Sequence, residues 1–245
     1  MKIAILTYGE FRTADVAVET WNVLKTKHDV DVYIHTQTTS GTNPISEYEI
    51  KKLFKNYKLW LEPIDNFRYD VEPRDIHMNF RSYRFLYKKL IESGINYDFI
   101  IVNRLDTILF IKDIDDFFKK NHSGVIYTLD DSITLDRTFI QDHFFMGSSE
   151  VILNFLKNLP TPDKLIHSHQ DFGKYLLSSG FKNIKYDFLY SFHLRPNMID
   201  FIKSIINLND NEFSQKLSKW FVDGKHGNLE TQWKHYLRHN IINQY

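Results

Sequence analysis

The residues best suited to chemistry in this sequence stand where apolar runs end. Arg104 and Asp106 lie in the segment DFIIVNRLDTILF, residues 98–110, which begins like a buried strand. Carboxylates bind hard cations through oxygen, and an arginine holds an anion with two parallel N–H bonds. A buried charge is costly unless it is paired, so an internal ion pair is the other interpretation of Arg104 and Asp106.

Two further apolar runs also end in polar residues. The first is followed by Tyr8, Gly9 and Arg12, and the second ends in His35 and Thr36. Taken singly, Gly9 fits a turn, Tyr8 fits simple packing and His35 fits a hydrogen-bonded core position. Ligands of open α/β sheets bind beyond the carboxyl ends of the strands. Polar residues at the ends of three strands therefore favour a site there.

The periodicity of apolar residues predicts strands that alternate with helices. Strands are expected over residues 2–7, 30–36, 58–64, 98–110, 123–129 and 184–194, and helices over 13–27, 46–57, 79–93 and 167–180. A short strand, a turn at Gly147 and a helix are expected in DHFFMGSSEVILNFLKNLP, and Ser46 with Glu49 predicts a capping box. The pattern predicts an α/β fold with a mostly parallel sheet covered by helices on both faces.

Composition narrows the class of protein. Thirty-one Lys and Arg balance thirty-one Asp and Glu, so no global field draws the chain to nucleic acid or anionic lipid. The absence of cysteine excludes disulfides and thiolate metal sites. No apolar stretch has the length of a signal peptide core or a membrane span, which predicts a cytoplasmic protein. P-loop and Gly-x-Ser-x-Gly motifs are missing from the sequence.

The segment YDFIIVNRLDTILF resembles the one in nucleotide-sugar glycosyltransferases of the GT-A fold, where a strand ends in Asp-x-Asp. Asp106 matches the second acid, and Arg104 takes the place of the first. A group of bacterial and viral sugar transferases similar to this chain carries Arg-x-Asp there. Gly9, Arg12 and Thr13 match a Gly-x-x-Arg-Thr motif that follows the first strand in the same group.

Shorter matches continue this resemblance in the right order over residues 1–195. DVYIHT matches a second strand, and Arg81 with Ser82 matches a serine-bearing helix before the acidic strand. QDHFFMGSSEVI resembles an acceptor-side segment, and HSHQDFGKYL resembles an acidic helix opening near the sugar. The resemblance implies a GT-A-like catalytic domain over residues 1–196, with residues 197–245 as a helical C-terminal extension.

The resemblance also implies roles for individual residues. The donor, a UDP-linked sugar, would contact residues from the first strand end, the helix and the acidic strand: Tyr8, Gly9, Arg12, Arg81, Ser82, Arg104 and Asp106. Asp106 would bind Mg²⁺ or Mn²⁺, which neutralises diphosphate charge, and Arg104 is the alternative clamp on the phosphates. Asp171 is the predicted general base, with Asp142 as the second candidate. An acid in the first turn of a helix is also favoured by the helix dipole, which is the other interpretation of Asp171.

Two acceptors stay open. A surface glycan is one, and a hydroxylated base in phage DNA is the other, which fits a bacterial or phage-infected cytoplasm. The C-terminal residues mix basic and aromatic side chains, which fits either an acceptor surface or an amphipathic helix docked on the domain. The alternative to an enzyme is a nucleotide- or sugar-binding module that keeps the fold without activity.

Overall fold

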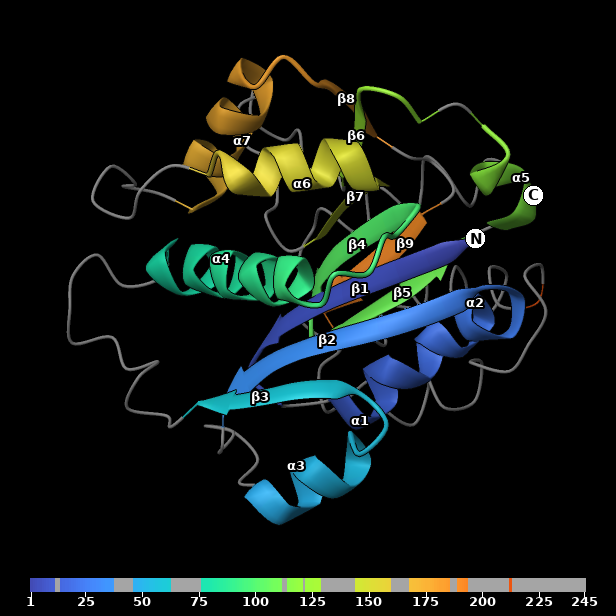
Figure 1. The fold of residues 1–245 in the computed structure, drawn as a ribbon, viewed down its shortest axis with the longest axis vertical. Coiled ribbons are helices and arrows are strands. Elements are labelled where there is room, and N and C mark those ends of the chain that lie inside the picture. The colour runs from blue at the N-terminus through green and yellow to red at the C-terminus, as the bar shows by residue number, and fades with distance from the viewer. Residues whose placement is uncertain are drawn as a thin grey trace, which may run out of the picture.

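The computed structural model describes residues 1–11, 14–37, 46–62, 76–111, 114–120, 122–128, 144–159, 168–185, 189–193 and 212. Its strands form a seven-stranded sheet and a two-stranded sheet (Figure 1). The large sheet has the order β3 (Lys58–Glu62), β2 (Asp29–Gln37), β1 (Lys2–Gly9), β4 (Phe99–Arg104), β7 (Phe144–Ser148), β6 (Val125–Thr128) and β8 (Lys182–Lys185). The small sheet pairs β5 (Thr107–Ile111) with β9 (Leu189–His193). Within the large sheet β7 runs antiparallel to β4 and β6, and the other pairs are parallel.

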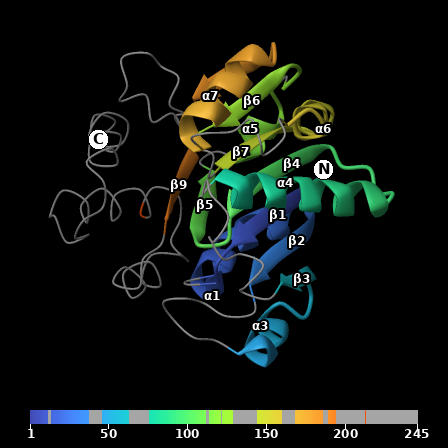
Figure 2. The same cartoon turned by 90° about the vertical axis from the view of Figure 1, so that its left-hand side faces the viewer.

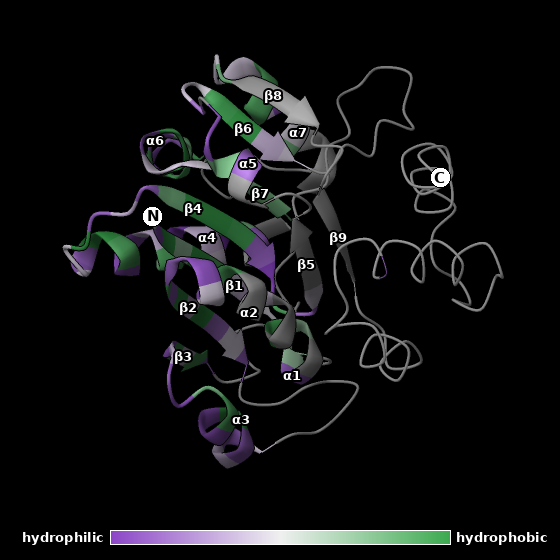
Figure 3. Ribbon diagram, turned by 90° about the vertical axis from the view of Figure 1, so that its right-hand side faces the viewer, coloured by the Kyte–Doolittle hydropathy of each residue, from purple (hydrophilic) through white to green (hydrophobic). Residues whose placement is uncertain are grey.

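Helices cover both faces of the large sheet, which confirms the predicted α/β class (Figures 1 and 2). One face carries α1 (Ala14–Ala17), the 3-10 helix η1 (Val18–Trp21), α2 (Asn22–Lys27), α3 (Glu47–Leu53) and α5 (Ile114–Phe118). The other carries α4 (Ile76–Glu92), α6 (Ser149–Lys157) and α7 (Ser168–Ser178). Because both faces are covered, central strands read as continuous apolar runs, and β4 is hydrophobic along most of its length (Figure 3).

The helix that matters most for the site is α4. Phe80, Tyr83, Leu86 and Leu90 recur at helical spacing and are all buried on the sheet. The chain leaves the helix at Gly94, whose φ of 64° lies in the left-handed region that glycine tolerates. The predicted helix over 79–93 is thus confirmed, and it starts three residues earlier than expected.

The predicted capping box at the start of α3 is also present. Ser46 Oγ accepts a hydrogen bond from the Glu49 amide at 3.2 Å, and Glu49 Oε2 accepts one from the Ser46 amide at 3.0 Å. Two amide groups that the helix cannot satisfy internally are therefore paired at its first turn.

Two predicted elements differ in the structure because they are broken. The helix expected over 13–27 consists of α1, η1 and α2, and the β-branched residues Val16, Val18 and Thr20 lower helix propensity there. The strand expected over 184–194 is two strands, β8 in the large sheet and β9 in the small one. Its apolar pattern carries no information about which strand each half pairs with.

The segment 98–110 also bends rather than running on as one strand. It forms β4, a turn at residues 105–106, and β5, which pairs with β9 in the other sheet. The Leu105 amide donates to the Tyr8 carbonyl at 2.7 Å and ends the pairing of β4 with β1. Asp106 consequently lies in a turn at the end of β4.

Gly147 lies inside β7, where the sequence predicted a turn. It is paired with Ile100 of β4 on one side and with Ile126 of β6 on the other. A Cβ at this position would lie 2.8 Å from the carbonyl oxygen of Val125 and 3.3 Å from Ile152 Cδ1. The glycine therefore serves close packing, which a glycine in a strand often marks.

The predicted C-terminal extension, residues 197–245, lies outside the described residues apart from Glu212. Among the helices that are described, none is long and apolar enough to cross a membrane.

Candidate functional site

The order of the large sheet reverses between β1 and β4. From β1 the chain places β2 and β3 on one side, and β4 then joins on the other side. In the registers of both pairs, Tyr8 stands opposite His35 and opposite Arg104. The polar strand ends found in the sequence therefore lie side by side at a topological switch point, which is where open α/β sheets bind ligands.

Arg104 and Asp106 form a two-pronged ion pair at this point. Arg104 Nε donates to Asp106 Oδ1 at 3.0 Å, and an Nη2 hydrogen is donated to Oδ2 at 2.8 Å. The Asp106 side chain is 2% exposed and the Arg104 side chain 20% exposed. The ion pair that the sequence left open is thus formed, with the guanidinium as its more accessible half.

The end of β1 is shaped by Gly9. Its φ of 110° is rarely adopted by residues with a side chain, and its carbonyl accepts a 2.7 Å hydrogen bond from Thr36 Oγ1. The preceding Tyr8 is 1% exposed, and its hydroxyl lies 2.7 Å from that of Tyr83. Tyr8 packs in the core here, and its stacking on a base or sugar stays a prediction.

Three successive residues of α4 are bonded to three successive strands of the sheet. Tyr83 bonds Tyr8 of β1, Ser82 Oγ lies 3.0 Å from His35 Nδ1 of β2, and Arg81 Nη2 lies 2.7 Å from Glu62 Oε2 of β3. Ser82 is buried, whereas the Arg81 side chain is 47% exposed. Polar links on one helix turn thus fix the start of α4 across the strand ends.

The central link in this row is the buried His35. Its Nε2 lies 3.0 Å from Glu62 Oε1, and its ring stacks on Phe85 with centroids 4.3 Å apart. Burial lowers the pKa of His35, and the nearby Glu62 opposes that shift without cancelling it. The imidazole is therefore neutral at pH 7 and joins helix to sheet by hydrogen bonding.

On the opposite face of the sheet, two buried polar atoms at the same strand ends lack hydrogen-bond partners among the described residues. They are Thr7 Oγ1 and Asn103 Oδ1, which belong to paired positions of β1 and β4. A buried polar atom without a partner costs about 1–3 kcal/mol. Both residues have no exposed surface, so a small buried group such as a water would be needed to satisfy them.

Sequence reasoning had not assigned a role to Thr7, Glu62 or Tyr83. Glu62 closes β3 and lies near the end of the strand predicted over 58–64, so the rule that selected Arg104 applies to it too. Tyr83 was counted as an apolar member of its helix. Nothing in the sequence indicates its hydroxyl contact with Tyr8.

The structure does not describe the side chains of three other predicted site residues. Arg12 and Asp142 lie outside the described residues. Asp171 lies in the first turn of α7, with its backbone described and its side chain outside the description. The grouping of these three with Arg104 and Asp106 stays a prediction.

The side chains described at this site are too few to hold a metal ion without further ligands. No group of three His, Cys, Asp or Glu side chains suited to a metal occurs within the described residues. Both oxygens of Asp106 accept hydrogen bonds from Arg104. Asp106 would thus supply one carboxylate, and the other oxygen ligands of a Mg²⁺ or Mn²⁺ ion would have to come from a bound molecule.

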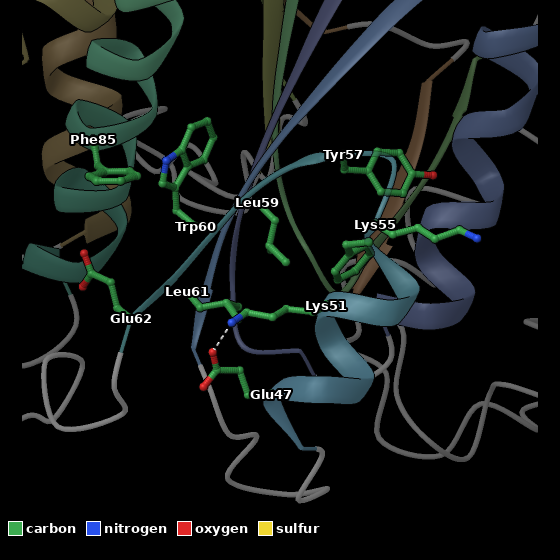
Figure 4. A pocket seen from close by; sticks show the side chains of 10 residues that line it. Glu47, Lys51, Lys55, Tyr57, Leu59, Trp60, Leu61, Glu62 and Phe85 are labelled. Carbon is green, nitrogen blue, oxygen red and sulfur yellow. Dashed lines mark ion pairs between the residues drawn. The ribbon is translucent and has the colours of Figure 1, made fainter.

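A separate hollow of about 630 Å³ lies at the β3 edge of the sheet, between α3 and α4 (Figure 4). Glu47 and Lys51 of α3 line it on one side, and Trp60, Glu62 and Phe85 on the other. It lies two strands away from the switch point between β1 and β4.

No protein-family model matches the sequence, and no curated protein matches it. Among solved structures, the chain is similar to a glycosyltransferase involved in the glycosylation of the major capsid of PBCV-1. The two are 12% identical with a TM-score of 0.40, over 76% of this chain and 81% of that one.

It is also similar to the glycosyltransferase GlyE of Streptococcus pneumoniae TIGR4, in its apo form and in a second structure. Both are 10% identical to this chain with a TM-score of 0.45, over 91% of this chain. This chain spans 63% and 64% of the two GlyE chains, less than two thirds of their length. Likenesses this distant leave the function to be argued from the site.

Proposed function

We propose that this protein transfers a sugar from a nucleoside diphosphate sugar, UDP-linked, to an acceptor hydroxyl. The observation that carries the proposal is the Arg104–Asp106 pair at the switch point between β1 and β4. The ordered sequence motifs that resemble GT-A glycosyltransferases include this pair and Gly9. Thr7 Oγ1 and Asn103 Oδ1 add buried polar atoms without partners at the same strand ends, on the other face of the sheet.

In this proposal Arg104 is the group that meets the diphosphate. A guanidinium fork binds phosphate oxygens with two hydrogen bonds and keeps its charge at any working pH. Asp106 is the more buried partner and holds the fork in one orientation, so little reordering is needed when the donor binds. As the bond from sugar to diphosphate breaks, charge grows on the leaving group, and a preorganised cation stabilises that charge.

The remaining steps are assigned to residues whose side chains lie outside the described part. Asp171 is the proposed base that takes the proton of the acceptor hydroxyl as its oxygen attacks the anomeric carbon, with Asp142 as the alternative. A bound Mg²⁺ or Mn²⁺ would supply Lewis-acid stabilisation of the diphosphate, with Asp106 as its protein ligand. Arg12, Arg81, Ser82 and Tyr8 complete the proposed donor contacts.

A thermal-shift screen of nucleoside diphosphates and their sugars tests the donor proposal. A ligand present at a hundred times its dissociation constant adds about 2.7 kcal/mol of stability. For a chain of this size each kcal/mol raises the melting temperature by about 2–4 °C. We expect one nucleotide to give such a shift, and a shift from none of them would contradict the proposal.

The double variant Arg104→Met/Asp106→Leu separates binding from stability. Replacing a buried ion pair by apolar residues of similar volume is often neutral or stabilising, so the variant should fold and melt close to wild type. We expect it to lose both the nucleotide shift and sugar transfer. The matched control Lys119→Met/Asp116→Leu removes an exposed ion pair at the C-terminal end of α5 and should keep both the nucleotide shift and sugar transfer. If the Arg104 variant keeps them, the pair is only structural.

The same proteins decide between an enzyme and a binding module. We expect wild type to release nucleotide from the donor sugar when acceptors are added, measured with chelator and with Mn²⁺. The feature that a binding module would explain is Arg104 itself, because an arginine stands where the resemblance has the first acid of Asp-x-Asp. If the protein binds the nucleotide sugar and releases nucleotide from it in none of these conditions, the result favours the binding module and contradicts the transferase proposal.

A further inference from the structure

Strand β3 ends the large sheet on one side. Among the described strands it is paired only with β2, through residues 58–62. The backbone N–H and C=O groups on its other side point outward from the sheet. An edge of this kind is a template for pairing with another strand unless it is blocked. All five residues of β3 are partly exposed, as expected of a strand at the edge of a sheet.

The sequence of β3 is complementary to itself when two copies run antiparallel. In KLWLE, pairing about Trp60 sets Lys58 opposite Glu62 of the partner subunit and Leu59 opposite Leu61 of the partner subunit. Opposite charges and apolar pairs directly across a ladder stabilise a sheet. A strand of five residues with its centre on the two-fold axis thus matches both charge and hydrophobicity.

The side chains that pair in this arrangement also lie on the same face of the sheet. Trp60 packs in the core cluster on the α4 side, and Leu59 and Leu61 pack in the cluster on the α3 side. Side chains alternate along a strand, so Lys58 and Glu62 lie on the same side as Trp60. Antiparallel pairing about Trp60 preserves these faces, and the two charges meet on one surface.

Within the described residues, a hollow and exposed apolar side chains lie beside the edge. The hollow of about 630 Å³ is lined from both sides of β3, by Lys51 of α3 and by Phe85 of α4 (Figure 4). Tyr48 and Leu53 on α3 are large apolar side chains that are 73% and 39% exposed. Stable interfaces bury more than roughly 1,000 Å², so a short strand pair with helical additions predicts a weak, concentration-dependent dimer.

We propose that a second copy of this chain docks on β3 by two-fold antiparallel pairing, which joins two sheets into one. The carboxyl ends of the two sheets then point in opposite directions, and neither copy covers the other's switch point between β1 and β4. Self-association is therefore independent of the proposed transferase function.

Charge reversal across the pair tests the proposal in the full chain. Lys58→Glu sets two glutamates opposite each other, and Glu62→Lys sets two lysines opposite each other. We expect wild type to show a monomer–dimer equilibrium in sedimentation equilibrium and each single variant to be monomeric. Equal amounts of the two variants mixed together should form a one-to-one dimer. The double variant Lys58→Glu/Glu62→Lys should dimerise again as wild type does.

Contacts within one chain cannot explain recovery of the dimer when the two single variants are mixed. Lys58 lies 3.4 Å from Asp31, and Glu62 lies 2.7 Å from Arg81 and 3.0 Å from His35. Each single variant loses the contacts of its own residue, and the double variant loses both sets. Only pairing between chains is restored by mixing. The controls Lys157→Glu and Glu150→Lys make the same charge changes on exposed positions of α6 and should leave the equilibrium unchanged.

A cross-link provides a second measurement that does not depend on charge. The chain has no cysteine, so Trp60→Cys introduces a single thiol at the two-fold axis. Directly opposed residues of antiparallel strands have Cα atoms about 4.5–5.5 Å apart, within disulfide range. Mild oxidation should give a covalent dimer, whereas Leu177→Cys, an exposed position on α7, should give far less. A wild type that is monomeric at every concentration, or mixing without dimer, overturns the proposal.

Discussion

Single residues at the strand ends behave according to how deeply they are buried. Asp106 is enclosed and paired, and Arg104 is the part of that pair that reaches the surface. His35 is fully buried and neutral, with Ser82 and Glu62 as its contacts. In the ion pair, the charge that water can reach lies on Arg104, the group suited to meet an anion, and Asp106 supports it from the interior. His35 carries no charge and links α4 to the sheet.

Replacing His35 changes how stability depends on pH. The ordinary pKa of histidine is 6.5, and burial lowers the pKa of His35 in the folded chain. Below pH 6.5 the unfolded chain binds a proton that the folded chain resists, so the stability supplied by neutral His35 is complete above that pH and is lost as the pH falls towards the folded pKa. We expect His35→Gln to have a shallower fall in the free energy of unfolding between about pH 7 and pH 5, measured by urea denaturation.

The second buried histidine provides the control for this comparison. The pKa of His122 is also lowered by burial, and it remains in both proteins, so its contribution cancels in the difference. Equal slopes for wild type and His35→Gln would contradict the role assigned to burial.

At the scale of elements, the site depends on how α4 and the turn after β4 meet the sheet. The consecutive residues Arg81, Ser82 and Tyr83 each bond a different strand. The turn at residues 105–106 sends β5 away to the small sheet and leaves Asp106 at the strand end. Close packing between strands is the other requirement, and Gly147 shows it most clearly.

Gly147→Ala should destabilise the fold by overpacking. The new Cβ would lie 2.8 Å from the Val125 carbonyl oxygen, so strands β6 and β7 have to shift apart. Overpacking of this kind costs about 1–3 kcal/mol, which thermal or urea unfolding measures. Adding Ile152→Val relieves only the side-chain contact, so the double variant should stay destabilised. Full recovery in the double variant would show that the backbone contact is unimportant.

For the whole molecule, the balance of charge bears on the acceptor. Thirty-one basic and thirty-one acidic residues leave a formal net charge of zero. Two helical layers cover the large sheet, and its β3 edge is the surface assigned to a second copy. A protein without net charge gains little from the general attraction that draws basic proteins to DNA.

A salt titration of duplex binding tests the DNA acceptor directly. Each phosphate neutralised on duplex DNA contributes about −0.9 to the slope of log affinity against log salt. With balanced charge we expect weak binding and a slope near zero, measured by fluorescence anisotropy beside a basic duplex-binding protein. A slope of several units would instead favour the hydroxylated base as acceptor over a surface glycan.

Local pattern accounts for much of the fold and for the choice of site residues. The apolar runs predicted β1, β2 and β4, the helical spacing of Phe80, Tyr83, Leu86 and Leu90 predicted α4, and Ser46 with Glu49 predicted the start of α3. Arg104 and Asp106 were selected because charged residues at the end of a buried strand are costly unless they are paired or bind a ligand. Each of these signals is carried by residues close together in the chain.

What the sequence determined by itself was the α/β class and the polar strand ends, because burial on both faces and strand termination leave local patterns. Only the tertiary structure decided that Arg104 and Asp106 pair with each other, that α4 bonds three strands, and that Gly147 packs between β4 and β6. Those facts join residues that lie far apart in the chain or depend on a turn that sets side-chain direction. The physical reason is that contacts across strands depend on register and burial, which no local run of residues encodes.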